Sequence, residues 1–279
     1  MERSHADGRD DARHGGQGAA VNRPDTGPPA HLSRGLQGSL FLRSLTLQAS
    51  WNNQRMQNLG LLWSILPWLQ RRPRDINRDR IFCRRYFGFF NTNPYLANFL
   101  LGGMVRLEED RDAGREVPPG MIGTFRDSVG RALASLGDQL FWLGLRPTLV
   151  MITCLAALLG QIPAILAVVG VFAVGQLALR WVALRRGYDL GMNIVDLLYD
   201  KRWHVWIGRT KRAGMVLTGV VAGVYLAQVT DGGQLADRGL LWIGTGLGLG
   251  FPLVLRKRLP GELMILAALA MAVLLTFAI

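Results

Sequence analysis

Three short clusters of amide, carboxylate, guanidinium and aromatic side chains lie in otherwise apolar parts of the sequence. They occupy residues 50–57 (SWNNQRMQ), 89–95 (FFNTNPY) and 137–142 (GDQLFW). Planar amides, carboxylates and guanidinium groups each engage neighbouring hydroxyl groups at more than one point, and aromatic faces pack against C–H surfaces. These residue types are therefore typical of a site that recognises a polyol or a sugar.

The best candidates for substrate contact or for shaping the site are Trp51, Asn52, Gln54, Arg55, Asn91, Asn93 and Asp138. Glu108 and Glu109 are weaker candidates, because two adjacent glutamates on a helix are more often part of a solvated face. A structural interpretation stays open for each cluster, since amides often bond neighbouring backbone and Asp138 could cap a helix. Three clusters of the same chemistry favour function, because polar groups at membrane depth are costly.

The sequence contains no recognisable catalytic or metal-binding set. Its two cysteines, Cys83 and Cys154, form no CxxC pair, and His204 is the only histidine outside the N-terminal tail. A phosphate-binding loop would need a glycine-rich run followed by lysine, which is absent. With no nucleophile–base pair either, we expect no catalytic residue, no metal and no cofactor.

The second half of the chain consists largely of apolar runs, at 148–184, 213–229, 239–255 and 262–279. A helix that crosses the hydrocarbon core needs roughly 17–25 residues, so the first run can hold two short spans and each later run one. The first run could be one tilted helix, two spans or a re-entrant hairpin, and Gly160 and Pro163 favour a break in it. We therefore predict an all-α, polytopic integral membrane protein.

The formal net charge of +12 comes almost wholly from arginines that flank the apolar runs. The positive-inside rule places 201–212 and 256–258 in the cytoplasm and 230–238 outside. Topology accounts for the basic excess, so nucleic acid is not an expected partner. Arg180, inside the first apolar run, either extends to the cytoplasmic interface or pairs within a complex.

Three regions follow from these patterns. Residues 1–35 are polar and rich in Gly and Pro, and we expect them to be a disordered tail without a signal peptide. Residues 36–147 read as amphipathic or re-entrant helices, with expected helices in 36–70 (interrupted by the first cluster), 76–90, 95–113 and 121–134. Residues 148–279 form the transmembrane region, with about four or five hydrophobic helices.

The clusters also carry a resemblance to a known family. The motifs are LRS at 42–44, SWN at 50–52, RMQ at 55–57, FFNTNPY at 89–95, LEE at 107–109, GD at 137–138, FW at 141–142, RP at 146–147, GY at 187–188, Gly191 and NIV at 193–195. From Phe41 to the C-terminus, the sequence resembles the IID subunit of mannose-class phosphotransferase-system (PTS) permeases.

The resemblance implies a partner and a mechanism. IID and a IIC subunit form a multi-pass carrier in the bacterial inner membrane for hexoses of the mannose, fructose, sorbose or amino-sugar type. The complex is typically a trimer of IIC–IID pairs with an elevator-like transport domain. Separate IIA and IIB proteins relay phosphate to the sugar, and IID bears no phosphorylated residue. Here His204 sits in a basic segment typical of a membrane interface.

The sequence departs from the family pattern at three positions. Gln54 stands where the family usually has Glu, and Arg131 and Gln139 stand where it usually has Pro. The missing prolines would remove fixed helix kinks, and Gln54 can donate as well as accept hydrogen bonds. A second hypothesis therefore stays open: a diverged regulatory or scaffolding membrane subunit without net sugar transport.

Overall fold

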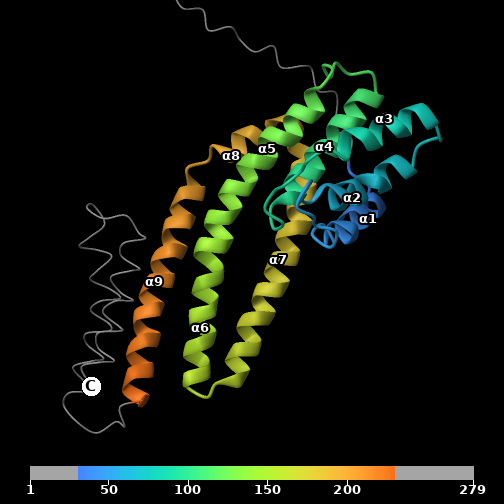
Figure 1. The fold of residues 1–279 in the computed structure, drawn as a ribbon. Coiled ribbons are helices and arrows are strands. Elements are labelled where there is room, and N and C mark those ends of the chain that lie inside the picture. The colour runs from blue at the N-terminus through green and yellow to red at the C-terminus, as the bar shows by residue number, and fades with distance from the viewer. Residues whose placement is uncertain (1–30, 230–279) are drawn as a thin grey trace, which may run out of the picture. The chain divides into compact units, whose positions relative to one another are not determined.

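The structure is a computed structural model that describes residues 31–229, and its regular elements are helices (Figure 1). They are α1 (Arg34–Ser44), α2 (Asn58–Gln70), α3 (Ile76–Tyr86), α4 (Ala97–Asp112), α5 (Met121–Gly137), the π-helix η1 (Asp138–Leu145), α6 (Arg146–Leu158), α7 (Ile162–Leu190), the 3₁₀ turn η2 (Gly191–Asn193), α8 (Ile194–Leu198) and α9 (Arg202–Val229). Within 31–229 there is no strand beyond isolated bridges. The all-α prediction is confirmed for this part of the chain.

Several predictions fall on residues 1–30 and 230–279, which lie outside the described part. They concern the disordered tail, the apolar runs 239–255 and 262–279, the outer loop 230–238 and the basic loop 256–258.

α1 begins at Arg34, where the Ser33 hydroxyl accepts a hydrogen bond from the Leu36 backbone N–H. Serine is a favoured N-cap because it satisfies a free helical N–H group.

α1, α2 and α3 pack together through aliphatic and aromatic side chains. Trp68 of α2 stacks on Phe82 of α3 at 5.4 Å between ring centroids, and Phe82 contacts Tyr86 at 4.7 Å. All three residues are buried. α3 ends at Tyr86, four residues before the predicted end at Phe90, because the chain turns there into the second polar cluster. Pro67 lies inside α2, within the predicted helical stretch 36–70.

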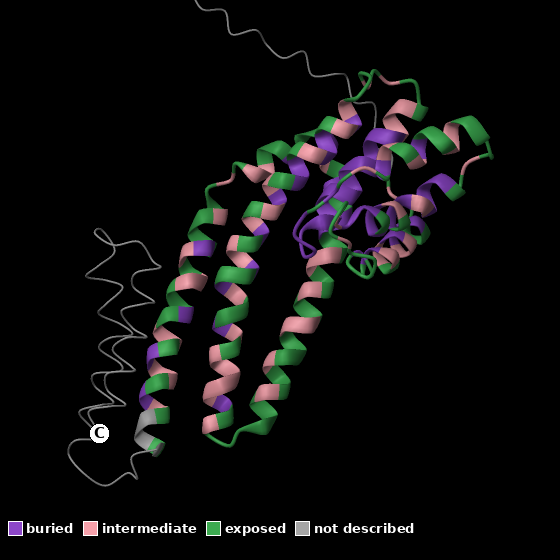
Figure 2. Cartoon of the chain, viewed as in Figure 1, coloured by how far each residue is buried: buried purple, intermediate pink, exposed green. Residues whose placement is uncertain are grey.

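α4 is the central helix of this part, and each of its residues from Ala97 to Glu108 is buried (Figure 2). It crosses α7 at two glycines. An added Cβ at Gly102 would collide with the Leu184 carbonyl, and one at Gly187 with the Phe99 carbonyl. Small residues let helix backbones approach this closely. The crossing fixes the start of α4, where the second cluster ends, against the apolar helix α7.

α5, η1 and α6 form one continuous helical segment from Met121 to Leu158. The expected end near Ala134 is therefore wrong. Asp138 has αR geometry inside this segment, so it does not cap a helix start. Neither Arg131 nor Gln139 interrupts the helix, and Pro147, which has no backbone N–H to donate, lies just after the π-helix η1.

A tight turn at Leu159, Gly160 and Gln161 separates α6 from α7. Gly160 has φ +68°, a left-handed conformation that glycine adopts without strain. α6 and α7 pack against each other, so the run 148–184 is two helices joined by a hairpin (Figure 1). The predicted break at Gly160 is confirmed.

Two helical segments of residues 31–229, Met121–Leu158 and Ile162–Leu198, are long and apolar enough to cross a membrane by length and composition. In Ile162–Leu198, no residue of the most apolar 18-residue window is buried. Figure 2 shows the half of α7 nearer the hairpin as exposed or intermediate. Core helices of soluble proteins bury such surface. The predicted run 213–229 lies in α9, which does not meet the same criterion. The expected count of about four or five hydrophobic helices is therefore not confirmed.

Candidate functional site

The first two polar clusters form adjacent loops joined by backbone hydrogen bonds. Asn52 and Met56 exchange N–H···O bonds of 3.2 and 2.9 Å, which closes the first loop on itself. The Gln57 N–H then donates to the Phe90 carbonyl at 2.8 Å, and the Phe90 N–H donates to the Arg55 carbonyl at 3.3 Å. The segments 50–57 and 89–95 are therefore held side by side, although more than 30 residues separate them in the sequence.

Gln57 locks the two loops together. Its side-chain Nε2 donates to the Thr92 carbonyl at 3.0 Å, and its Oε1 accepts from the Thr92 N–H at 3.1 Å. The Gln57 side-chain amide therefore pairs with the Thr92 backbone as a second peptide group would. Both residues are buried. The Thr92 hydroxyl donates to the Gly130 carbonyl of α5 at 2.9 Å. The second cluster is thereby fixed to the helix that leads to the third.

The third cluster joins the second through Asn93. Its Nδ2 donates to Asp138 Oδ1 at 3.0 Å, and its Oδ1 accepts from the Tyr95 N–H at 3.0 Å. Asn93 is buried and Asp138 is exposed. An added Cβ at Gly137 would collide with the Asn93 side chain, so the glycine allows the contact. All three clusters consequently meet in one region of the fold.

The predicted site residues divide into two groups. Asn52 and Asn93 have amides that hold the loops, since Asn52 Oδ1 accepts from the Arg55 N–H at 2.8 Å and Nδ2 donates to Asn58 Oδ1 at 3.3 Å. The exposed group comprises Trp51, Gln54, Arg55, Asn91 and Asp138. In the described part of the chain, the side chains of Gln54 and Asn91 form no hydrogen bond. These exposed polar groups remain available to a ligand.

The sequence interpretation missed Gln57 and Thr92 as the residues that build the site. Both lie inside the family-like motifs RMQ and FFNTNPY, but their roles depend on the register of two distant loops. An aromatic contact was also missed: Tyr95 stacks on Phe141 at 4.5 Å, and the Arg180 guanidinium lies 5.4 Å from the Tyr95 ring centroid. Arg180 is thus turned toward the second cluster.

Glu108 lies in the interior, so its interpretation as part of a solvated face is wrong. Its side chain is fully buried, pairs with Arg85 and Arg111, and accepts a 2.7 Å hydrogen bond from the Tyr86 hydroxyl. Burial, and then the negative charge of Glu108, raise the pKa of Tyr86 well above its usual value. Glu109 accepts a hydrogen bond from the Tyr188 hydroxyl. Both glutamates therefore connect helices: Glu108 joins α4 to α3, and the half-buried Glu109 joins α4 to α7.

The described residues contain no group of three or more His, Cys, Asp and Glu side chains that could hold a metal ion. The assembled clusters offer amides, a guanidinium group, a carboxylate and indole rings at a surface. Such groups bind hydroxyls by hydrogen bonds and C–H faces by stacking.

Comparisons with known proteins agree with this chemistry. Residues 31–231 match the PTS system mannose/fructose/sorbose family IID component. The chain belongs to this family. The mannose-specific EIID component of Escherichia coli (strain K12) is 35% identical over 157 residues, which cover 56% of each protein. The sorbose-specific EIID component of Klebsiella pneumoniae is 32% identical over 166 residues, 59% of this chain and 60% of that one. The chain thus spans less than two thirds of the length of these curated relatives.

Two solved structures share the fold. A chain described as a membrane protein superposes with a TM-score of 0.64 at 25% identity. The matched region covers 88% of the present chain and 96% of the solved one. A chain of the cryo-EM structure of the mannose transporter ManYZ with Microcin E492 superposes with a TM-score of 0.55 at 24% identity and covers 87% and 95%. The resemblance inferred from the motifs is confirmed, and the fold likeness to membrane proteins supports a membrane location.

Proposed function

We propose that the chain is the IID-type membrane subunit of a sugar-transporting phosphotransferase-system permease. In this role it pairs with a IIC subunit, and together they carry a mannose-class hexose across the bacterial inner membrane. Soluble IIA and IIB proteins supply the phosphate, and the chain itself has no catalytic residue. The assembly is a trimer of IIC–IID pairs.

The observation that carries this proposal is the meeting of the three polar clusters. Gln57, Thr92 and Asn93 connect segments that are far apart in sequence, and the exposed side chains around them have sugar-binding chemistry. The family relatives named above are mannose- and sorbose-specific, and a further relative is the fructose permease IID component of Bacillus subtilis. The substrate class of this chain follows by analogy with them.

A IIC partner is supported by apolar surface that the other described residues, 31–229, leave exposed. Val171 and Val174 of α7 are 74% and 68% exposed, and Leu166 is 69% exposed. Lipid covers one side of such a helix, and a second membrane subunit covers the other. We therefore place the substrate path at the interface of the two subunits. One side is formed by α7 and its neighbouring loops, and the other by the IIC partner.

The membrane orientation follows from charge and from one contact. Gln228 Nε2 at the end of α9 donates to the Leu158 carbonyl at 2.8 Å, so α9 ends beside the α6–α7 turn. Residues 201–212, at the start of α9, are strongly basic, and cytoplasmic loops carry such excess. The turn at Gly160 is then on the outer side and the three clusters lie toward the cytoplasm, in a multi-pass topology.

Sugar uptake in a deletion strain tests the transport role. Removing the gene should abolish uptake of at least one labelled hexose among mannose, fructose, sorbose and glucosamine, and the wild-type gene should restore it. Asn91→Ala should not restore it, because it removes an exposed amide of the site. The control Asn77→Ala removes an exposed asparagine of α3 outside the clusters and should restore uptake. Normal uptake of every one of these sugars in the deletion strain would contradict the transport role.

A further inference from the structure

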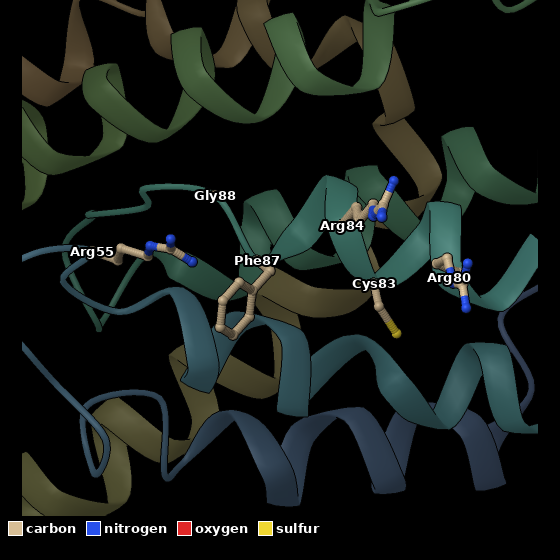
Figure 3. Close-up of a pocket in the computed structure, with 6 residues that line it drawn as sticks. All are labelled: Arg55, Arg80, Cys83, Arg84, Phe87 and Gly88. Carbon is tan, nitrogen blue, oxygen red and sulfur yellow. The ribbon is translucent and has the colours of Figure 1, made fainter.

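A basic pocket lies next to the first cluster, between its loop and α3. Its volume is about 480 Å³, and it is lined by Arg55, Arg80, Cys83, Arg84, Phe87 and Gly88. Figure 3 shows Arg55 extending from the loop toward the Phe87 ring, with the remaining side chains following along α3. Arg55 is the only one of the seven predicted site residues that lines this pocket, so the pocket adjoins the candidate site and shares one residue with it.

The pocket has three arginines that form no ion pair within residues 31–229, and the nearby carboxylate of Asp79 lies beside Arg78. Arg55, Arg80 and Arg84 form no ion pair with any carboxylate in the described part of the chain. Neighbouring arginines differ: Arg78 lies 3.6 Å from Asp79, and Arg85 pairs with buried Glu108. Like charges around one opening repel each other, and an anion between them would relieve the repulsion. Arginine presents a planar fork of donors that matches phosphate, so phosphate is the anion that fits best.

The position of α3 favours a ligand from the aqueous phase over a lipid headgroup. α1 contacts Trp181 of α7 through Phe41, at 5.2 Å between ring centroids. Trp181 lies beside Arg180 where the apolar run of α7 ends, and tryptophan and arginine mark membrane interfaces. Along the direction of α7, α3 lies beyond α1 and α2, farther from the Gly160 turn (Figure 1). In the proposed orientation the pocket therefore faces the cytoplasm.

The pocket is larger than a lone phosphate ion requires and has an apolar wall. The Phe87 ring is 41% exposed, and the Arg55 guanidinium lies 4.8 Å from its centroid. Binding sites for small molecules have volumes of roughly 300–1,000 Å³ and combine aromatic surface with a few charged groups. An aromatic face packs against the C–H side of a sugar ring.

We propose that this pocket binds a phosphorylated hexose, with Arg80 and Arg84 on the phosphate and with Arg55 and Phe87, which lie together at the other end of the pocket, beside the sugar. The hexose part rests on the proposed function, in which phosphorylated sugar is the product released on the cytoplasmic side. Arg55 also belongs to the first cluster. A ligand that contacts Arg55 in the pocket therefore contacts the same loop that carries Trp51 and Gln54. The pocket is a product site next to the transport site.

Cys83 provides a direct measurement of occupancy. The full chain in inside-out membrane vesicles is alkylated with N-ethylmaleimide, and mass spectrometry follows the peptides of Cys83 and Cys154 separately. Burial, and then the nearby charge of Asp79, raise the pKa of the Cys83 thiol, so less thiolate is present at a given pH and alkylation is slow enough to follow over time. Cys154 lies on the apolar helix α6, outside the pocket, so its peptide is followed only to detect a general change in the vesicles, and the alkylation rate of Cys83 without ligand is the reference.

Mannose 6-phosphate should slow alkylation of Cys83 and leave Cys154 unchanged. At ten times its Kd, a competing ligand leaves about one pocket in eleven free, so the rate should fall about tenfold. Unphosphorylated mannose and inorganic phosphate at the same concentration should protect far less. Equal protection by inorganic phosphate would overturn the hexose assignment, and equal protection by mannose would overturn the phosphate assignment. Absence of protection by mannose 6-phosphate would overturn the pocket itself.

Matched arginine variants locate the binding. Arg80→Gln and Arg84→Gln should each raise the concentration that gives half-maximal protection by about tenfold or more, since each removes a charge-assisted contact. Arg74→Gln removes an exposed arginine of the same basic segment outside the pocket and should change nothing. Equal effects of all three would overturn the assignment to the pocket. Because no step requires sugar uptake, this result is independent of the deletion-strain test.

Discussion

At the scale of single residues, the polar clusters contain two kinds of side chain that composition alone does not separate. Gln57, Thr92 and Asn93 are buried and bonded to distant parts of the chain. Gln54 and Asn91 are exposed on the same short segments. Neighbouring amides thus have different roles: those of Gln57 and Asn93 hold the loops together, whereas those of Gln54 and Asn91 are exposed and can bind a ligand.

Gln57→Ala should destabilise the protein. It would leave the buried Thr92 N–H and carbonyl without partners, at a cost of about 1–3 kcal/mol. Gln54→Ala removes the same chemical group from an exposed position, where substitutions usually change stability by less than about 0.5 kcal/mol. Melting temperatures of the two detergent-purified variants test this. Equal melting temperatures would show that the Gln57–Thr92 bonds do not hold the loops together.

The sequence predicted the chemistry of these residues but not their partners. Amides, guanidinium groups and indoles are visible in the motifs, so the sugar-type character could be inferred. The pairing of Gln57 with Thr92 depends on loop register across 35 positions, and no local pattern encodes it. Glu108 shows the same limit, because its burial depends on Arg85 and Tyr86 from another helix.

At the scale of the elements, the crossing of α4 and α7 sets the position of the second cluster. Gly102 and Gly187 let the two backbones touch, and Asn98 Nδ2 donates to the Arg180 carbonyl at 3.0 Å beside them. The loop that ends at Tyr95 is therefore anchored to an apolar helix. A shift of this crossing would displace Asn93 from Asp138.

Gly187→Leu should disrupt the crossing. The new side chain would collide with the Phe99 carbonyl, and forced overpacking costs roughly 1–3 kcal/mol or more. Gly175→Leu is the matched control on the same helix, since an added Cβ there meets no atom within 4 Å. Thermal melting in detergent distinguishes the two. If Gly175→Leu lowered the melting temperature as much as Gly187→Leu, the crossing would not be the cause.

Helix positions were predicted better than helix ends. Glycine and proline residues identified the break at Gly160, which has φ +68°. The end of α3 and the continuity of α5, η1 and α6 were not predicted. Apolar periodicity in the sequence predicts which face of a helix is buried. It does not predict tertiary contacts such as Asn93–Asp138, which lies where α5 continues into η1.

At the scale of the whole molecule, the described residues contain buried polar structure at one end and exposed apolar helix at the other. The loops and α1 to α4 are held by buried side chains, whereas the half of α7 nearer the α6–α7 turn is exposed or intermediate along its length (Figure 2). Hydrophobicity identified from the sequence the apolar runs of the two helical segments that are long and apolar enough to cross a membrane. The surface of the proposed partner could not be predicted from this sequence, because the partner's own residues supply half of the contact.

The measurement that tests the account most directly is the hexose-dependent melting temperature of the complex purified through this chain. We predict that a IIC subunit co-purifies and that a transported hexose at about 100 times its Kd stabilises the complex by about 2.7 kcal/mol, a rise of a few degrees. Asn91→Ala should abolish this rise, whereas Asn77→Ala should keep it. Purification without a IIC subunit, or a rise that Asn91→Ala leaves unchanged, would contradict a sugar site built by the exposed side chains of the three clusters.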